Sequence, residues 1–387
     1  MSTVKKHTGI LPMTDFGRMD AWLLINTLLL VSLSIVMVYS ATIVTDAQSY
    51  ASGIGRAGKH AIYVAVGLLG MTVIAHIPMS FWQRFARHFM VFGVLLLALI
   101  LIPGIGYEVN GSTRWLVVGP LRIQPSEFMK LFMIIYMADY LTRRRAQLKS
   151  FKLGVLNIAV VVGIVGGLLL LEPDLGTTIV IASTVFAMMY VSGVRYSHML
   201  LCVIVAGTAF VLLAVLSPYR LERVMSFQNP WADPWDSGFQ LSQALIAFGR
   251  GEWFGMGLGQ SIQKLFYLPH AANDFLAAVI AEELGFAGML VLISMYVAFL
   301  WRGFSIAAKA EKSGHDFAAR SAHGVIILIS LQAIVNLGVN MGVLPTKGIT
   351  LPLMSYGGSS IIVTLALVGL VFAVDRELRT PAGSRRK

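Results

Sequence analysis

The sequence predicts an all-α integral membrane protein with ten transmembrane helices, both termini in the cytoplasm and one large extracytoplasmic loop. Of its 387 residues, 57% are hydrophobic and only 13% are charged, whereas a soluble domain carries about 25% charged residues. The apolar residues form runs of about 20, the length of helix that crosses a hydrocarbon core roughly 30 Å thick. These observations exclude a soluble enzyme, a disordered chain and a disulfide-stabilised secreted domain.

Ten apolar segments follow one another along the chain. The first is too long for a signal-peptide core and lacks a clear small-residue cleavage site, so we interpret it as an uncleaved anchor. The predicted spans cover residues 21–43, 60–79, 87–105, 125–142, 153–171, 176–193, 196–217, 275–301, 323–345 and 358–375.

The distribution of basic residues indicates how these spans are oriented. An even number of spans places both termini on one side, and with the N-terminus inside most of the 30 Lys and Arg residues face the cytoplasm. The chain then has a cytoplasmic tail (1–20), a membrane domain (21–375) and a basic cytoplasmic tail (376–387). This topology accounts for the net charge of +11, so no nucleic-acid partner is predicted.

Residues 218–274 form the large extracytoplasmic loop. Connections of this length are usually either functional or disordered, and the many Trp, Phe and Tyr residues of this one argue against disorder. Within it, residues 239–248 place Leu241, Leu245 and Phe248 at helical spacing. We therefore expect an amphipathic helix at the outer membrane interface, and chemistry on the outer side.

Charged side chains within or next to the spans are candidates for function, because charge at membrane depth is costly. Glu127 and Lys130 lie three residues apart on the fourth span and can pair on one helix face. The pair either locks helices together or serves a site. Glu172 and Asp174 flank a proline between the fifth and sixth spans. Asp174 is either the N-cap of the sixth helix or a functional carboxylate.

Two further polar features lie near the outer ends of later spans. Gln332, Asn336 and Asn340 recur every four residues on the ninth span, and this stripe either hydrogen-bonds neighbouring helices or lines a wet cavity. Asp274 ends the large loop and begins the eighth span. A carboxylate in that place is well positioned as a general base, with a helix cap as the alternative.

Five long motifs carry a family resemblance. They are VNGSTRWLVVGPLRIQPSEFMK at 109–130, EPDLGTT at 172–178, FQNPWADPWDSGFQLSQALIAFGRGEWFGMGLGQSIQKLFYLP at 227–269, AEELG at 281–285 and NLGVNMGVLPTKGITLPLMSYGGSS at 336–360. In order and over nearly the whole chain, they resemble the SEDS family (shape, elongation, division and sporulation). The third motif is similar to the division branch of that family.

The resemblance implies a peptidoglycan glycosyltransferase that polymerises lipid II, an undecaprenyl-pyrophosphate disaccharide-peptide, outside the bacterial inner membrane at the division septum. It also implies its partners: membrane lipid, a class B penicillin-binding transpeptidase (FtsI-like), and FtsQ-, FtsL-, FtsB- and FtsN-like divisome regulators. The family's catalytic aspartate stands in Pro-Glu-Ala-His-Thr-Asp-Phe. Here residues 269–275 read Pro-His-Ala-Ala-Asn-Asp-Phe, which assigns catalysis to Asp274, while His270, Ala272 and Asn273 depart from the pattern.

The chemistry of this reaction defines the residues that we expect in the site. The donor sugar is α-linked to pyrophosphate and the product bond is β-1,4, so the anomeric centre inverts and one base, Asp274, takes the acceptor's proton. Positive charge must stabilise the leaving pyrophosphate. A divalent cation (Mg²⁺ or Mn²⁺) could supply part of this charge, although the sequence contains no clear ligand set and no zinc motif. The expected substrate-binding residues are Arg114, Trp115, Gln124, Ser126, Glu127, Lys130, Glu172, Asp174, Arg220, Arg223, Lys264, Asn336, Asn340 and Lys347.

Two other functions stay open at this point. A lipid II flippase would use Glu127, Lys130, Glu172 and Asp174 along an alternating-access path. A non-catalytic division scaffold would hold the transpeptidase, and the changed residues beside Asp274 keep this reading open. A polymerase requires Asp274, a flippase depends more on the buried charges, and a scaffold requires neither.

Overall fold

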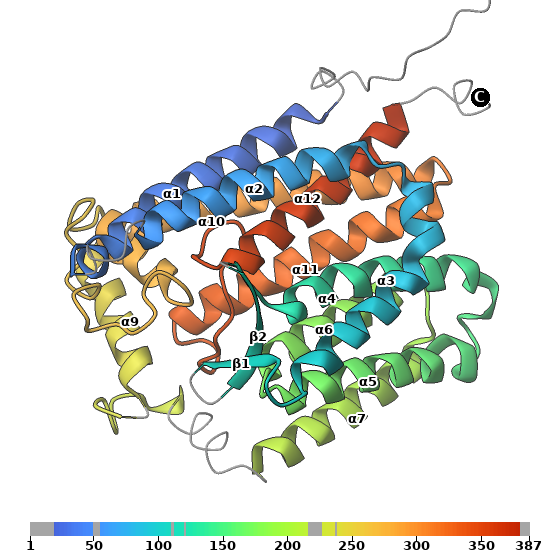
Figure 1. Cartoon of the computed structure of the whole chain (residues 1–387), viewed down its shortest axis with the longest axis horizontal. Coiled ribbons are helices and arrows are strands. Elements are labelled where there is room, and N and C mark those ends of the chain that lie inside the picture. Colours follow the sequence, from blue (N-terminus) through green and yellow to red (C-terminus); the bar gives the residue numbers. More distant parts are fainter. Residues whose placement is uncertain are drawn as a thin grey trace, which may run out of the picture.

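The computed structural model describes residues 19–48, 55–109, 112–119, 121–215, 227–236 and 238–379. Within them, ten long helices coincide with the ten predicted spans (Figure 1). They are α1 (Ala21–Gln48), α2 (Arg56–His76), α3 (Met79–Ile100), α4 (Pro125–Arg143), α5 (Asn157–Leu171), α6 (Leu175–Val191), α7 (Tyr196–Val215), α10 (Leu276–Lys312), α11 (Asp316–Asn340) and α12 (Gly358–Arg379). A short 3₁₀ helix (Arg145–Gln147) and one π-helical turn (Lys152–Leu156) precede α5.

Seven described helices are long and apolar enough to cross a membrane: α1, α2, α3, α5 with the turn before it, α10, α11 and α12. Helix α4 is less apolar because it contains Glu127, Lys130, Asp139 and Arg143, and the described apolar parts of α6 and α7 are shorter than 18 residues. The chain is thus built as a multi-pass membrane protein, and the count of ten spans stays a prediction.

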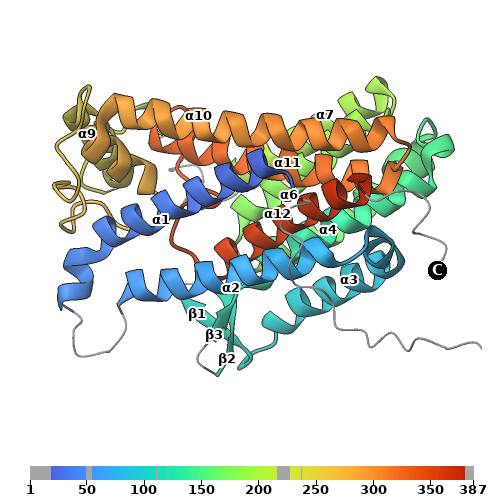
Figure 2. The ribbon, with the colours of Figure 1, turned by 90° about the horizontal axis from the view of Figure 1, so that it is seen from above.

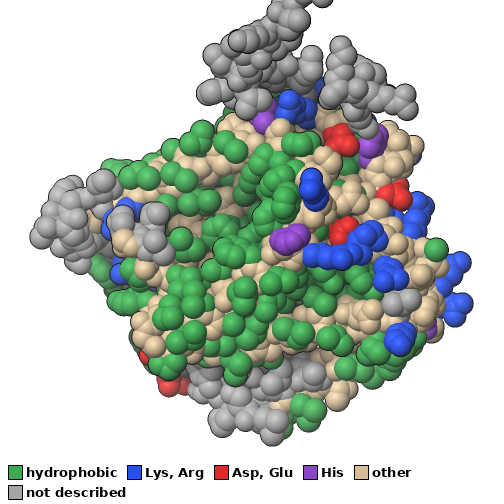
Figure 3. All heavy atoms as spheres, turned by 45° about the vertical axis from the view of Figure 1, so that its right-hand side comes forward, with side chains coloured by type: hydrophobic (Ala, Val, Ile, Leu, Met, Phe, Trp, Pro, Cys, Tyr) green, Lys and Arg blue, Asp and Glu red, His purple; other side chains and the backbone are tan. Residues whose placement is uncertain are grey.

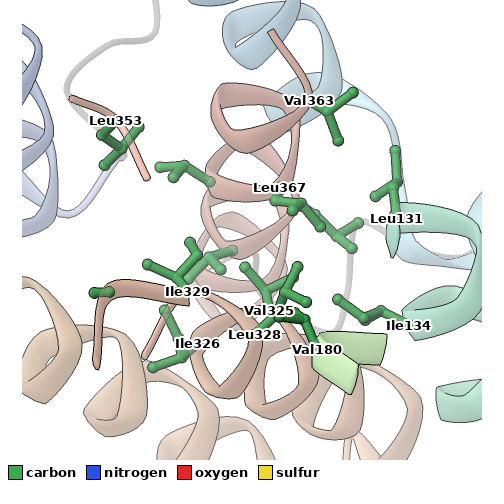
Figure 4. Close-up of a cluster of buried hydrophobic side chains, with 14 of the residues drawn as sticks. Leu131, Ile134, Val180, Val325, Ile326, Leu328, Ile329, Leu353, Val363 and Leu367 are labelled. Atoms are coloured by element: carbon green, nitrogen blue, oxygen red, sulfur yellow. The ribbon is translucent and has the colours of Figure 1, made fainter. Parts of the chain in front are cut away.

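The helices pack side by side into one bundle with α11 and α12 in its interior (Figures 1 and 2). Helix α11 contacts α4, α6, α10 and α12, and Figure 4 shows Val325, Leu328 and Ile329 of α11 gathered with Leu367 of α12 and Ile134 of α4. All five side chains are buried. Apolar side chains of α11 face several neighbouring helices and are not confined to one stripe, which explains why α11 shows almost no amphipathic pattern.

A small antiparallel sheet departs from the all-α prediction. Strands β1 (Gly106–Val109), β2 (Ser112–Val118) and β3 (Leu121–Ile123) lie between α3 and α4 in the order β1-β2-β3. Trp115 pairs with Tyr107 and Val117 with Arg122. The run STRWLVV is rich in the β-branched and aromatic residues that favour strands, so a local signal existed. The sheet contacts α3, α4 and α12 and places β2 beside the candidate site.

The helix predicted in the large loop is confirmed as α9 (Phe239–Gly251). Its apolar face, with Leu241, Ala244 and Ala247, is buried, and the helix contacts α10 and α11. The amphipathic pattern therefore reflects packing against the bundle. Its hydrophobic side contacts α10 and α11. We expected this side to lie on the membrane interface, and the structure corrects that expectation.

The segment after α9 is attached to the first turns of α10. The backbone N–H of Met256 donates to the carbonyl of Glu282 at 2.9 Å, and that of Phe286 donates to the carbonyl of Glu252 at 2.9 Å. Gly285 has a φ of +69°, and a Cβ there would lie 2.3 Å from the backbone nitrogen of Gly255. Only glycine fits this close approach, which holds the start of α10 in place.

Candidate active site

A cavity of about 730 Å³ opens where α4, α6, α10 and α11 meet the loops that precede α10 and α12. It collects residues from four of the five motifs and from residues 270–275, many of them polar. Its described lining is Ser112, Arg114, Trp115, Gln124, Glu127, Lys130, Pro173, Asp174, Leu175, Gly176, Thr177, Val180, Gln240, His270, Asn273, Asp274, Phe275, Gln332, Thr346, Lys347, Gly348, Ile349, Thr350, Tyr356, Gly357 and Ser360.

Asp274 lies in this lining, at the entrance to α10. The N-cap of that helix is the next residue, Phe275, which makes no side-chain cap bond. Asp274 itself is half-buried, and a Cβ on Gly348 would lie 3.0 Å from its Oδ2 atom. The Asp274 carboxylate therefore lies against the backbone of the Lys347–Gly348 segment. A glycine at position 348 leaves the room that this arrangement requires.

The polar stripe on α11 fixes the backbone of Asp274. Asn336 Nδ2 donates to the Asp274 carbonyl at 2.8 Å and Asn340 Nδ2 donates to the same oxygen at 2.9 Å. Asn336 Nδ2 also donates to the carbonyl of Ile349 at 2.6 Å. The remaining member of the stripe, Gln332, lines the cavity. Both readings of the stripe thus hold, each for different residues.

The predicted pair Glu127–Lys130 lies on the α4 wall of the cavity. Lys130 Nζ is 2.7 Å from Glu127 Oε2, and both side chains are buried. Removing one member of a buried pair leaves an uncompensated charge, which is more costly than removing both. Both residues also line the cavity, so this buried ion pair is part of the candidate site.

Asp174 is the N-cap of α6 and also lies in the lining of the cavity. Its Oδ1 accepts a hydrogen bond from the backbone N–H of Thr177 at 3.2 Å, which makes it the N-cap of α6. It also lines the cavity. Ser126 Oγ donates to Asp174 Oδ2 at 3.4 Å, and Gln124 Nε2 donates to Ser126 Oγ at 3.1 Å. This chain connects the start of α4 to the start of α6.

Arg114 and Glu172 meet at the rim. From β2, Arg114 donates to the carbonyls of Glu172 at 3.1 Å and Pro173 at 2.5 Å. The Glu172 side chain is fully buried and is absent from the described lining of the cavity. Burial, and then the nearby Asp174 charge, raise the pKa of Glu172 to about 8, against the lowering effect of Arg114. At neutral pH its carboxyl is therefore protonated.

Four predicted cationic residues have different outcomes. Lys347 lines the cavity, whereas Arg220 and Arg223 lie outside the described residues. Lys264 is buried away from the described lining, with its Nζ 2.8 Å from Glu283 Oε1 and 3.0 Å from Ser40 Oγ. Separating a buried, hydrogen-bonded ion pair leaves an uncompensated charge and is costly, so the Lys264 ammonium stays with Glu283. The structure therefore places Lys264 in the attachment of the large loop to α1 and α10, and corrects its placement at the pyrophosphate.

The cavity contains polar residues that the sequence reasoning did not select. They include Ser112, Thr177, Gln240 from α9, Thr346, Thr350, Tyr356 and Ser360. The available signal was the polar, glycine-containing run between the ninth and tenth spans, where TLPLMSYGGSS ends a long motif. Gln240 stands in the motif at 227–269, but nothing in that motif indicated the cavity, because its helix reaches the cavity only through its packing on α10 and α11.

The charges of the described lining are balanced: Arg114, Lys130 and Lys347 face Glu127, Asp174 and Asp274, with His270 besides. Over the part of the chain that the structure describes, no group of three or more His, Cys, Asp or Glu side chains gathers into a metal site. The lining residues suit a substrate that carries both hydroxyl groups and phosphates.

Comparisons with known proteins agree on one family. The family model described as "Cell cycle protein", named for FtsW, RodA and SpoVE, matches residues 21–380. The probable peptidoglycan glycosyltransferase FtsW of Nitrosococcus halophilus is 49% identical over 367 residues, 95% of this chain and 95% of the relative. That of Legionella pneumophila is 44% identical over 360 residues, 93% of this chain and 91% of the relative.

Solved structures show the same relationship. One is a chain from a peptidoglycan synthase complex, in a structure on the coordination of polymerization and crosslinking. Its TM-score is 0.78 at 31% identity, and the match covers 94% of our chain and 99% of that chain. The Thermus thermophilus rod shape determining protein RodA has a TM-score of 0.68 at 27% identity, over 95% of this chain and 100% of its own. The resemblance predicted from the five motifs is confirmed.

Proposed function

The chain belongs to the cell cycle protein family of FtsW, RodA and SpoVE, and we infer that it is a peptidoglycan glycosyltransferase, like the FtsW relatives that bear this name. The position of Asp274 is the observation that supports this site for the reaction. Its carboxylate lines a polar cavity, and two asparagine amides of α11 hold its backbone. A positioned carboxylate next to a cavity of this size is the arrangement that a general base requires.

We propose that the substrate is lipid II and that Asp274 removes the proton from the acceptor sugar hydroxyl. The acceptor oxygen then attacks the anomeric carbon of the donor, the bond to the pyrophosphate breaks, and the centre inverts. Lys347, next to the glycine that abuts Asp274, supplies positive charge to the leaving group. Arg114, which also lines the cavity, adds a second cation. No step is assigned to a divalent cation.

The remaining lining residues hold the sugars and the peptide in this proposal. Gln124, Trp115 and Asp174 offer an amide, an indole ring and a carboxylate in the lining. Ser126, Glu172, Asn336 and Asn340 act as positioning residues, because they contact lining residues or their backbone. The Glu127–Lys130 pair also lies in the lining. In this proposal, the lining residues contact the substrate, and the positioning residues hold the lining residues in place.

We place the protein in the bacterial inner membrane at the division septum, with ten spans and both tails in the cytoplasm. Lys and Arg side chains gather at one end of the face in Figure 3, while hydrophobic side chains cover much of the rest, as positive-inside orientation requires. The similarity to a chain of a peptidoglycan synthase complex supports a class B penicillin-binding transpeptidase as partner. Divisome regulators belong to the same proposal.

The test is reconstitution of the protein in liposomes, alone and with its transpeptidase, on purified lipid II. Asp274→Asn keeps the size of the side chain and removes its basicity, so we expect glycan polymerisation to fall by about 10²–10⁴-fold. Product length and rate are measured by gel electrophoresis of the glycan. Asp233→Asn is the matched control, because Asp233 is exposed in the large loop and absent from the described cavity lining.

The outcomes distinguish the three functions. Polymer from wild type but not from a well-folded Asp274→Asn variant supports a glycosyltransferase with this base. Equal polymer from both removes Asp274 from the role. No polymer from wild type, even with the transpeptidase and divalent cations, contradicts the enzyme and favours a flippase or a scaffold. In that case, changing His270, Ala272 and Asn273 to the family residues is the next step.

A further inference from the structure

The loop between α11 and α12 is buried although it has no regular structure. Leu351, Leu353, Met354 and Ser355 are each no more than 3% exposed. A buried backbone must have its N–H and C=O groups paired, and at membrane depth an irregular segment is tolerated only where protein supplies the partners. Residues 349–357, which we call the buried loop, therefore depend on side chains from the surrounding helices.

Helices from several sides provide these partners. Tyr296 of α10 donates its hydroxyl to the carbonyl of Pro352. Asn336 of α11 donates to the carbonyl of Ile349 at 2.6 Å. The backbone N–H of Tyr356 donates to the carbonyl of Ala272 at 2.9 Å, two residues before the proposed base. The buried loop is thus bound both to the bundle and to the segment that carries Asp274.

The carbonyl of Met354 is paired from the other side, through α1 and α2. Ser34 Oγ donates to the Met354 carbonyl at 2.6 Å, and His60 Nε2 lies 2.7 Å from Ser34 Oγ. Ser34 has a single hydroxyl proton, which goes to Met354, so His60 Nε2 must be the donor to Ser34. Both side chains are fully buried.

The same geometry determines the protonation state of His60. Its Nδ1 atom has no hydrogen-bond partner among the described residues. A proton on Nδ1 would be a buried donor without an acceptor, which is costly, so the ring is the neutral tautomer with its proton on Nε2. Neutral His60 thus completes a relay of three groups that ends on the buried loop.

We propose that His60 and Ser34 are positioning residues of the active site, which hold the buried loop against the substrate cavity. The buried loop supplies Thr350, Tyr356 and Gly357 to the cavity lining, while neither His60 nor Ser34 belongs to that described lining. Two helices on the far side of the bundle therefore help to set the shape of the substrate site. For its kinetic consequence, this inference rests on the proposed glycosyltransferase function.

Variants at these two positions test the relay. His60→Met and Ser34→Ala remove one donor each, whereas His60→Gln keeps an N–H donor of similar reach. His76→Met is the matched control, because His76 lies exposed at the end of the same helix. Hydrogen exchange of residues 351–357 is measured by mass spectrometry in nanodiscs, and kcat and KM are measured with lipid II.

We expect His60→Met and Ser34→Ala to speed exchange of the buried loop and to raise KM about ten-fold with kcat nearly unchanged. His60→Gln should restore both values, and the double variant should be no worse than either single one, because the residues act in series. His76→Met should match wild type.

Unchanged exchange in Ser34→Ala, the smallest of the changes, overturns the inference. So does faster exchange with an unchanged KM in an active enzyme, because the effect is then only structural. The exchange measurement needs no catalysis. If wild type forms no polymer while His60→Met still loosens the buried loop and His60→Gln does not, the positioning contact stands and the proposed function fails.

Discussion

Glu172 is the residue whose chemical state is changed most clearly by the fold. Its two carboxyl oxygens are buried and have no hydrogen-bond partner within the described chain. The neighbouring Asp174 carboxylate disfavours a second negative charge there, and the positive charge of Arg114 partly offsets this effect. Glu172 lies in the α5–α6 connection, so its neutral form keeps this connection compact beside the cavity.

This state predicts a pH dependence of stability. In the unfolded chain Glu172 loses its proton near pH 4.5, whereas in the folded protein it keeps the proton up to a pKa of about 8. The stability that it contributes is complete below about pH 4.5 and declines as the pH rises to about 8. Glu172→Gln, which stays neutral, should therefore unfold at a higher temperature than wild type at pH 8 and at a similar temperature at pH 4.5.

The measurement is the thermal midpoint in detergent across this pH range. Glu108→Gln is the control, because Glu108 is an exposed carboxyl on β1. Identical slopes of midpoint against pH in wild type and Glu172→Gln would show that Glu172 is ionised in the folded protein, contrary to this account.

At the scale of elements, the contact between α2 and α12 depends on glycine. A Cβ on Gly369 would lie 2.6 Å from the backbone oxygen of Met71 and 3.0 Å from its Cα. A Cβ on Gly67 would lie 2.6 Å from a Leu365 side-chain atom. Small residues let helix backbones approach closely, which is the main source of helix association in membranes. Since α2 also carries His60, this contact supports the relay to the buried loop.

Gly369→Ala should therefore destabilise the bundle, because the backbone of α2 has to move away. Gly70→Ala is the matched control on α2: nothing lies within 4 Å of its added Cβ, and alanine in a helix is favoured over glycine by up to about 1 kcal/mol. We expect a lower thermal midpoint for the first variant and an equal or higher one for the second, in the same detergent. A midpoint for Gly369→Ala at or above wild type would contradict the close contact.

At the scale of the whole molecule, Asp20 joins three helices at the end of the bundle where the described chain begins and finishes (Figure 1). It accepts hydrogen bonds from Arg302 of α10, whose Nε lies 2.8 Å away, and from Arg379 of α12 at 3.3 Å, and it caps α1 through the N–H of Leu23 at 3.0 Å. Both ends of the described chain thus lie together, as an even number of spans requires.

The cluster predicts an acid-sensitive contribution to stability. The hydrogen bond from Arg302 holds the pKa of Asp20 below its usual value, against the effect of burial. The contribution is therefore present above about pH 3.8 and is lost as the pH falls below it. Asp20→Asn should lower the free energy of unfolding by about 2 kcal/mol at neutral pH.

Chemical denaturation in detergent measures this difference. The variant should also lose part of the decline in stability at acid pH that wild type shows. Asp236→Asn, an exposed change in the large loop, is the control. Equal stabilities of Asp20→Asn and wild type at neutral pH would mean that the three helices are held at this end by apolar contacts alone.

The sequence was sufficient for the ten helices, the family and the proposed base. A chain in lipid must pair its own backbone groups, so a long apolar run becomes a helix whatever surrounds it. The motif around Asp274 and the four-residue spacing of Asn336 and Asn340 are also local patterns, which can be recognised in the sequence alone. The ten helices observed at the predicted positions and the confirmed family follow from such local information.

The membership of the cavity depended on contacts between segments far apart in the sequence. Helices that are apolar on every side contain no signal for the face that meets a neighbour. Lys264 and Lys347 lie in the connections before α10 and α12, where no local pattern indicates which partner either of them meets. Only packing distinguishes them: Lys264 is enclosed with Glu283, while Lys347 faces Asp274's cavity. The positions of β2 and Gln240 beside the cavity and the relay from His60 to Met354 were hidden for the same reason, since burial and pairing arise when the helices come together.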